Sequence, residues 1–101
     1  MQQDPTVLLV EDEPALRTGT EQFLRQRGFT VVTAVSGEEA LEKFTEADVI
    51  VLDIMLPGMS GIETLHQIRQ TSDVPVLMLT ALHDEPTQIA SFDELADDYM
   101  S

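Results

Sequence analysis

The sequence predicts an α/β fold, a doubly wound parallel sheet flanked by helices. Short apolar runs alternate along the chain with segments whose apolar residues recur at helical spacing. The runs are about five residues long, rich in β-branched side chains and without polar alternation, which is typical of strands buried on both faces. Acidic residues directly follow the first and third runs, at what would be the carboxyl edge of such a sheet.

The first helix and the strands follow from this pattern. Strands are expected at roughly Thr6–Val10, Thr30–Ala34, Asp48–Leu52 and Val74–Leu79. A helix begins near Pro14, because proline is favourable in a first turn, and ends at Gly28, a C-terminal cap. One stripe of this helix carries Leu16, Thr20, Phe23, Leu24 and Arg27.

Capping signals mark the next two helices. Ser36 with Glu39, and Ser60 with Glu63, have the spacing of a capping box. The inward residues expected on these helices are Ala40, Leu41, Phe44, Ile62, Leu65 and Ile68. A fourth helix is expected from Asp84 to Leu95, and Tyr99-Met100-Ser101 looks like a fifth strand that has only begun.

Size and composition limit the function. The 101 residues, 43% of them hydrophobic, suit one globular domain, and no apolar run approaches the roughly 20 residues of a membrane span. No secretory signal is visible and cysteine is absent, so a cytoplasmic protein is expected. Nineteen acids against five basic residues, a net charge of −14, argue against nucleic-acid or anionic membrane binding by this segment.

Three carboxylates are the candidate functional groups. Glu11 and Asp12 follow the first strand, and Asp53 follows the third, so all three should meet at one edge of the sheet. They would repel one another unless a cation joined them, and Mg²⁺ suits an all-oxygen site. Alternatively, Glu11 and Asp12 could serve the amino end of the first helix, and Asp53 could simply face solvent.

Several motifs resemble the receiver domains of two-component response regulators, in the same order and over nearly the whole chain. They are Leu8–Pro14, Asp53–Gly61, Val74–Ala81 and Ala96–Met100. The resemblance implies a CheY-like, flavodoxin-like sheet with strand order 2-1-3-4, followed by a fifth strand. It also implies a non-enzymatic signalling domain that switches an attached output, of the winged-helix DNA-binding and transcriptional kind.

The resemblance also implies a role for each site residue. Asp53 would be the phosphoacceptor of a sensor histidine kinase. Mg²⁺ would be the cofactor, held by Glu11, Asp12, Asp53 and the backbone carbonyl of Met55. Thr80 would hydrogen-bond the phosphoryl group, and Tyr99 would be the aromatic that moves on activation. The chemistry agrees, because a carboxylate attacks a phosphoryl group when a cation neutralises the developing charge.

The sequence departs from the family pattern in three places. The family lysine would fall just after Ser101, and Lys43 is the only lysine present. We therefore expect residues 1–101 to be a receiver domain truncated before its last strand and helix, without its output domain. Glu94-Leu95 replaces a small residue and glycine. Homodimerisation through the fourth-helix and fifth-strand face would lack its usual ion pairs, because Asp84–Leu95 contains no basic residue.

Other functions fit the residues less well. A receiver that no longer takes phosphate would be a structural or interaction module. A magnesium-dependent phosphatase with an aspartyl-phosphate intermediate wants a second aspartate where Met55 stands. A flavodoxin-like phosphate loop conflicts with Glu11-Asp12-Glu13, and no glycine-rich dinucleotide motif follows a strand. His66 and His83 lack metal-ligand spacing and are expected at the surface.

Overall fold

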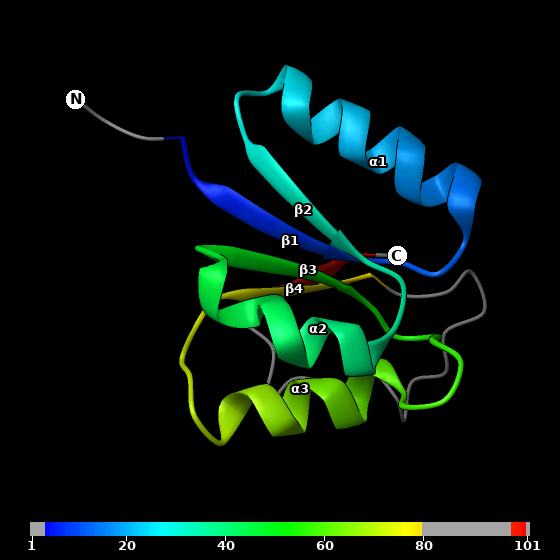
Figure 1. Ribbon diagram of the computed structural model, residues 1–101, viewed down its shortest axis with the longest axis vertical. Helices are drawn as coiled ribbons and strands as arrows, with labels where there is room; N and C mark the ends of the chain where they lie inside the picture. The colour runs from blue at the N-terminus through cyan, green and yellow to red at the C-terminus, as the bar shows by residue number, and fades with distance from the viewer. Residues whose placement is uncertain (1–3, 80–97, 101) are drawn as a thin grey trace.

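The computed structural model describes residues 4–79 and 98–100, and its sheet has five parallel strands in the order β2-β1-β3-β4-β5 (Figure 1). The predicted doubly wound sheet and its strand order are confirmed. The strands are β1 (Thr6–Val10), β2 (Thr30–Ala34), β3 (Val49–Asp53), β4 (Val76–Leu79) and β5 (Asp98–Met100). The helices are α1 (Pro14–Gln26), α2 (Gly37–Lys43), the 3-10 turn η1 (Phe44–Glu46) and α3 (Gly61–Arg69).

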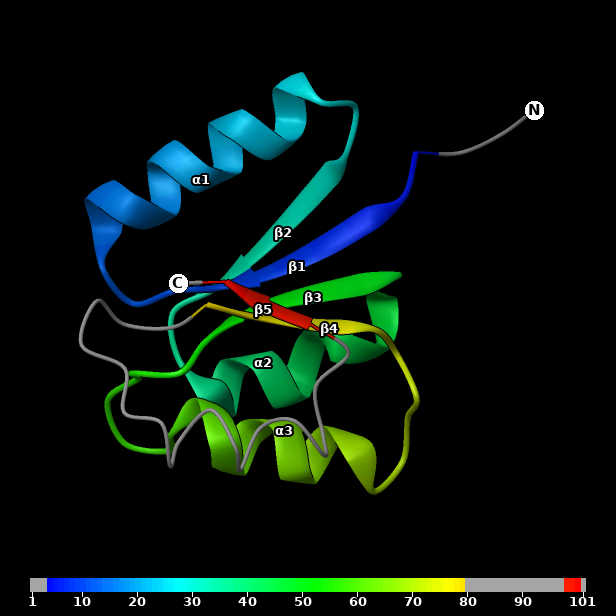
Figure 2. The ribbon, with the colours of Figure 1, turned by 180° about the vertical axis from the view of Figure 1, so that it is seen from behind.

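The sheet separates two layers of helices. α1 lies over one face, whereas α2 and α3 lie together over the other, as both ribbon views show (Figures 1 and 2). Consequently the residues of β1 from Val7 to Val10 are all buried, as the unbroken apolar run predicted. Leu8 and Val10 belong to the core beneath α2 and α3, and Val7 and Leu9 to the smaller core on the α1 side.

The limits of β3 and β4 differ from the sequence expectation. β3 begins and ends one residue later than expected, so Asp53 is its last residue rather than the residue after it. β4 begins at Val76, because Pro75 has no N–H for a ladder bond, although its carbonyl still accepts the N–H of Ile50 at 2.9 Å.

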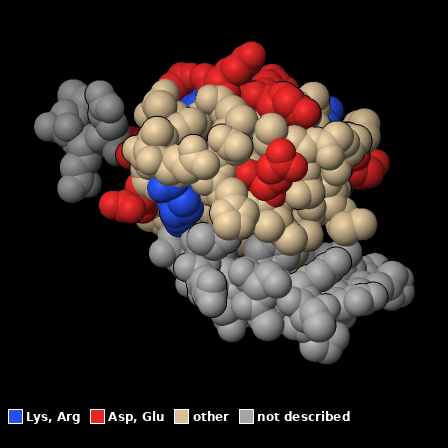
Figure 3. Space-filling model, turned by 90° about the horizontal axis from the view of Figure 1, so that it is seen from below, with Lys and Arg blue, Asp and Glu red and all other residues tan. Residues whose placement is uncertain are grey.

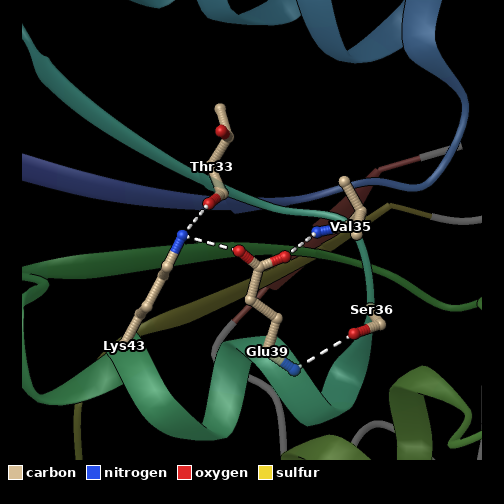
Figure 4. Close-up of polar contacts among 5 residues, drawn as sticks. All are labelled: Thr33, Val35, Ser36, Glu39 and Lys43. Atoms are coloured by element: carbon tan, nitrogen blue, oxygen red, sulfur yellow. Dashed lines mark hydrogen bonds and ion pairs between the residues drawn. The ribbon is translucent and has the colours of Figure 1, made fainter.

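The start of α2 combines the predicted cap with a second, unpredicted set of bonds. Ser36 Oγ accepts the N–H of Glu39 at 3.1 Å, as a capping box requires. The Glu39 carboxylate, however, reaches past Ser36 to the N–H of Val35 at 2.8 Å and pairs with Lys43 at 2.7 Å (Figure 4). Lys43 Nζ also donates to the Thr33 carbonyl at 2.8 Å, which ties α2 to the end of β2.

The stripe on α1 is only partly buried. Leu24 packs against the core, but Leu16 and Phe23 are 52% and 53% exposed. An amphipathic stripe normally faces the core, but these two residues of α1 are exposed to solvent. The helix lies against β2 and β1 (Figures 1 and 2), and Leu24 is a residue of the stripe that packs on the core there.

The other helix signals agree with the structure. Pro14 opens α1, and Gly28, with φ of 96°, follows its C-terminal cap. Ser60 caps α3 by accepting the N–H of Glu63, and Leu65 and Ile68 are buried. The expected fourth helix, Asp84 to Leu95, lies outside the described residues. Within the described part of the chain, no helix has the length and apolar character needed to cross a membrane.

Candidate functional site

The three predicted carboxylates meet at the carboxyl edge of the sheet. β1 and β3 are neighbouring parallel strands, and Val10 lies in register with Leu52. Glu11 therefore follows β1 beside Asp53, the last residue of β3. One carboxylate oxygen from each of Glu11, Asp12 and Asp53 lies within 4.8 Å of the others. Among the described residues, this acidic cluster has the donor set of a cation site, as the sequence predicted.

The three acids differ in their surroundings. Glu11 is only 2% exposed, Asp53 is partly buried and Asp12 is exposed. Glu11 Oε2 accepts the N–H of Glu13 at 3.1 Å, while Oε1 is buried without a hydrogen-bond partner. A buried carboxylate oxygen with no donor costs free energy. A cation coordinated at this edge would satisfy that oxygen.

The electrostatics of the acidic cluster favour uptake of positive charge. Burial raises the pKa of Glu11 to about 7, and the neighbouring charges of Asp53 and Asp12 act in the same direction. Burial also raises the pKa of Asp53, and the N–H of Met55 opposes that rise. Both carboxylates are therefore destabilised as anions when no cation is present, which is the condition that a metal ion relieves.

The segment after β3 holds Asp53 in place. Asp53 Oδ1 accepts the N–H of Met55 at 3.1 Å, and the Gly61 N–H donates to the Ile54 carbonyl at 3.0 Å. A side chain at Gly61 would collide with the backbone of Asp53 and Ile54, so α3 can begin here only with glycine. Gly58, with φ of 70°, allows a tight turn at Pro57-Gly58.

Glu11 and Asp12 were considered as acids that stabilise the amino end of α1, but Glu13 mainly fills that role. Glu13 caps α1, its carboxylate accepting the N–H groups of Ala15 at 3.2 Å and Leu16 at 2.6 Å. Glu11 contributes only the bond to the Glu13 N–H. Glu13 was not predicted as a cap, although its position directly before Pro14 is a signal for one.

The remaining predicted residues are described in part. Met55 lies at the same edge with its side chain exposed. Tyr99 lies in β5 in register with Met78, which places its backbone beside β4; its side chain is outside the description. Thr80 and His83 lie outside the described residues, and His66 is exposed as expected. Acidic side chains are spread over the face shown in Figure 3, in keeping with nineteen acids in the chain.

Comparison with known proteins gives one consistent result. Residues 7–101 match the response regulator receiver domain family. The transcriptional regulatory protein AfsQ1 of Streptomyces coelicolor is 43% identical over 98 residues, which cover 95% of this chain and 44% of that protein. A probable transcriptional regulator, ycf27 of Guillardia theta, is 46% identical over 93% of this chain and 38% of that protein. The chain thus spans less than half the length of these relatives.

Solved structures agree with this fold. Chemotaxis protein CheY4 of Vibrio cholerae superposes with a TM-score of 0.87 at 32% identity, covering 96% of this chain and 85% of that one. The response regulator TrrA of Thermotoga maritima, solved in complex with Mg²⁺–BeF, has a TM-score of 0.84 at 36% identity and covers 95% and 84%.

Proposed function

The chain belongs to the response regulator receiver domains, and from that premise we propose that Asp53 accepts a phosphoryl group from a sensor histidine kinase. Glu11, Asp12, Asp53 and the backbone carbonyl of Met55 would hold the required Mg²⁺. The observation that carries this proposal is the convergence of three carboxylates within 4.8 Å, one of them with a buried oxygen that has no partner.

The donor set fits magnesium in particular. Every candidate ligand is oxygen, the chain has no cysteine, and the cluster is open to water on the side of the exposed Asp12. Mg²⁺ retains several waters and binds through one or two carboxylates with the phosphoryl oxygens of its partner. When bound, it would neutralise charge on the phosphoryl oxygens. The Mg²⁺–BeF complex of the related Thermotoga regulator supports the same assignment.

The residues of this chain would perform the transfer itself. The bond from Met55 N–H to Asp53 Oδ1 fixes the carboxylate at the sheet edge, ready for in-line attack. A carboxylate oxygen of Asp53 forms a bond to phosphorus as the P–N bond to the donor's imidazole breaks, and the electron pair of that bond stays on the nitrogen. The reaction leaves the phosphoryl group on Asp53 of this chain and releases the dephosphorylated donor, so the product is the modified domain itself.

The charge added at Asp53 would then reach the neighbouring strands. Asp53 is in register with Leu79, the last residue of β4, and β4 pairs with β5. We assign Thr80 to the phosphoryl hydrogen bond and Tyr99 to the moving aromatic, with the fourth-helix and fifth-strand face as a homodimer contact. An attached transcriptional output and a cytoplasmic location complete the proposal, supported by the transcriptional regulators that the chain resembles.

Phosphorylation is tested by measuring the mass of the intact protein. A small phosphodonor with Mg²⁺ should add one phosphoryl group to the protein, and chelation of Mg²⁺ should prevent it. Asp53→Asn should take none, whereas Asp73→Asn, which alters an exposed acid away from the sheet edge, should react like the wild type. An adduct that survives in Asp53→Asn would place the acceptor elsewhere. No adduct on any variant would favour the interaction module.

A further inference from the structure

Arg17 contacts the acidic loop in a way that the magnesium proposal does not use. It lies in α1, is half-buried, and directs Nη1 back toward the end of β1. Nη1 donates to the carbonyl oxygen of Glu11 at 3.1 Å and to that of Asp12 at 3.3 Å. One guanidinium nitrogen thus binds both consecutive peptide groups of the acidic pair.

Arg17 bonds to backbone carbonyls and not to the carboxylates of the acidic cluster. Among the described residues, no ion pair joins Arg17 to Glu11, Asp12 or Asp53; ion pairs elsewhere include Arg25 with Glu21 and Lys43 with Glu39. A guanidinium paired with these acids would compete with a metal ion for their oxygens. Bonded to the carbonyls, it holds the loop while the carboxylate oxygens stay available.

The contacts of Arg17 are needed because the three carboxylates of the acidic cluster tend to move apart. Glu11 and Asp12 are consecutive, so in an extended chain their side chains would point to opposite sides. Here both reach the edge occupied by Asp53. The loop is fixed further by the Glu11 N–H, which donates to the Ala34 carbonyl at 3.0 Å, and by the Glu13 N–H on Glu11 Oε2. Repulsion among three carboxylates opposes this arrangement.

We infer that Arg17 is a positioning residue for the cation site: by bridging the carbonyls of Glu11 and Asp12, it preorganises the two carboxylates for Mg²⁺. This inference rests on the proposed function, because it presumes that the acidic cluster binds the metal. Replacing Arg17 should change the affinity for Mg²⁺ in a definite direction. Coulomb repulsion alone would make the loss of a positive charge near the site strengthen Mg²⁺ binding, whereas loss of a positioning contact weakens it.

The test is titration calorimetry of Mg²⁺ at neutral pH and moderate ionic strength. Arg17→Met should bind Mg²⁺ about tenfold more weakly than the wild type, the scale expected for losing hydrogen bonds from a charged donor. Arg17→Lys, with one flexible ammonium in place of the planar fork, should bind about threefold more weakly. The control is Arg27→Met, which removes a charge from the other end of α1, where Arg27 stacks over the Phe23 ring at 4.5 Å.

A second measurement separates positioning from folding. Urea unfolding of each variant with EDTA and with saturating Mg²⁺ gives the stabilisation that the metal adds. A purely structural role for Arg17 would lower stability equally in both conditions and leave that increment intact. If Arg17→Met does not fold, Arg17→Gln, which retains one donor, takes its place.

The outcomes are distinct. Weaker Mg²⁺ binding and a smaller metal increment in the Arg17 variants, with Arg27→Met unchanged, support the inference. Equal or tighter binding in Arg17→Met overturns it while leaving the metal site standing. Absence of Mg²⁺ binding by the wild type overturns both the inference and the proposed function.

Discussion

Replacing Glu11 with glutamine tests the electrostatics of the site without requiring phosphorylation. Burial raises the pKa of Glu11 from 4.5 to about 7 in the metal-free protein. An acid with a higher pKa in the folded state keeps its proton up to a higher pH there than in the unfolded chain. Its stabilising contribution is therefore fully present below pH 4.5 and is lost as the pH rises through about 7. Each pKa unit corresponds to about 1.4 kcal/mol, so this displacement is worth about 3 kcal/mol.

The assay is urea denaturation followed by circular dichroism between pH 5 and pH 8 in EDTA. Glu11→Gln has no charge to bury, so its free energy of unfolding relative to the wild type should rise by about 2–3 kcal/mol over this range. Glu42→Gln, which removes an exposed acid on α2, should show no such rise. Burial raises the pKa of Asp53 too, whereas its hydrogen bond with Glu11 lowers it, so the pH dependence that the comparison measures belongs to the pair of carboxylates.

The same variant should lose the response to metal. At a Mg²⁺ concentration one hundred times its dissociation constant, the wild type should gain about 2.7 kcal/mol. Glu11→Gln should gain much less, since the amide offers Mg²⁺ a weaker ligand than a carboxylate. A difference in stability between Glu11→Gln and wild type that stays constant from pH 5 to pH 8 would refute the reasoning. It would mean that the Glu11 carboxylate is ionised at little cost in the folded protein.

Three further predictions concern the scaffold. Gly61→Ala should lower the free energy of unfolding by at least 2 kcal/mol, because the new Cβ would approach Ile54 Cα to 2.8 Å. Gly19→Ala, in α1 with nothing within 4 Å of its Cβ, should instead raise it by about 0.5–1 kcal/mol, and thermal unfolding of the pair distinguishes strain from helix propensity. Lys43→Met should cost about 1 kcal/mol at neutral pH by urea unfolding, through its bonds to Glu39 and the Thr33 carbonyl. The loss should shrink in acid: Lys43 lowers the pKa of Glu39, so the stability gained by that pair is present at neutral pH and lost as the pH falls through the lowered pKa. A Lys43→Met deficit that is independent of pH would contradict this role.

The local features of the fold were readable from short patterns. The apolar run of β1, the proline at the start of α1 and the serines that cap α2 and α3 act within a few residues, so spacing alone predicts them. The meeting of Glu11 with Asp53 was also predictable, because both follow strands of one parallel sheet. Leu16 and Phe23 were less predictable, since helical periodicity does not say how much of a stripe the sheet covers.

The sequence by itself determined the sheet, the helix caps and the position of the three acids at the carboxyl edge of the sheet. Strand periodicity and helix capping are local properties. Tertiary structure decided the unequal state of those acids. Glu11 and Asp12 are adjacent in sequence, yet one is buried with a raised pKa and the other is exposed. It also brought the Arg17 guanidinium to the carbonyls of both. The burial of Glu11 and its approach to Asp53 arise only when β1 and β3 pair in the sheet, so no spacing in the chain encodes them directly.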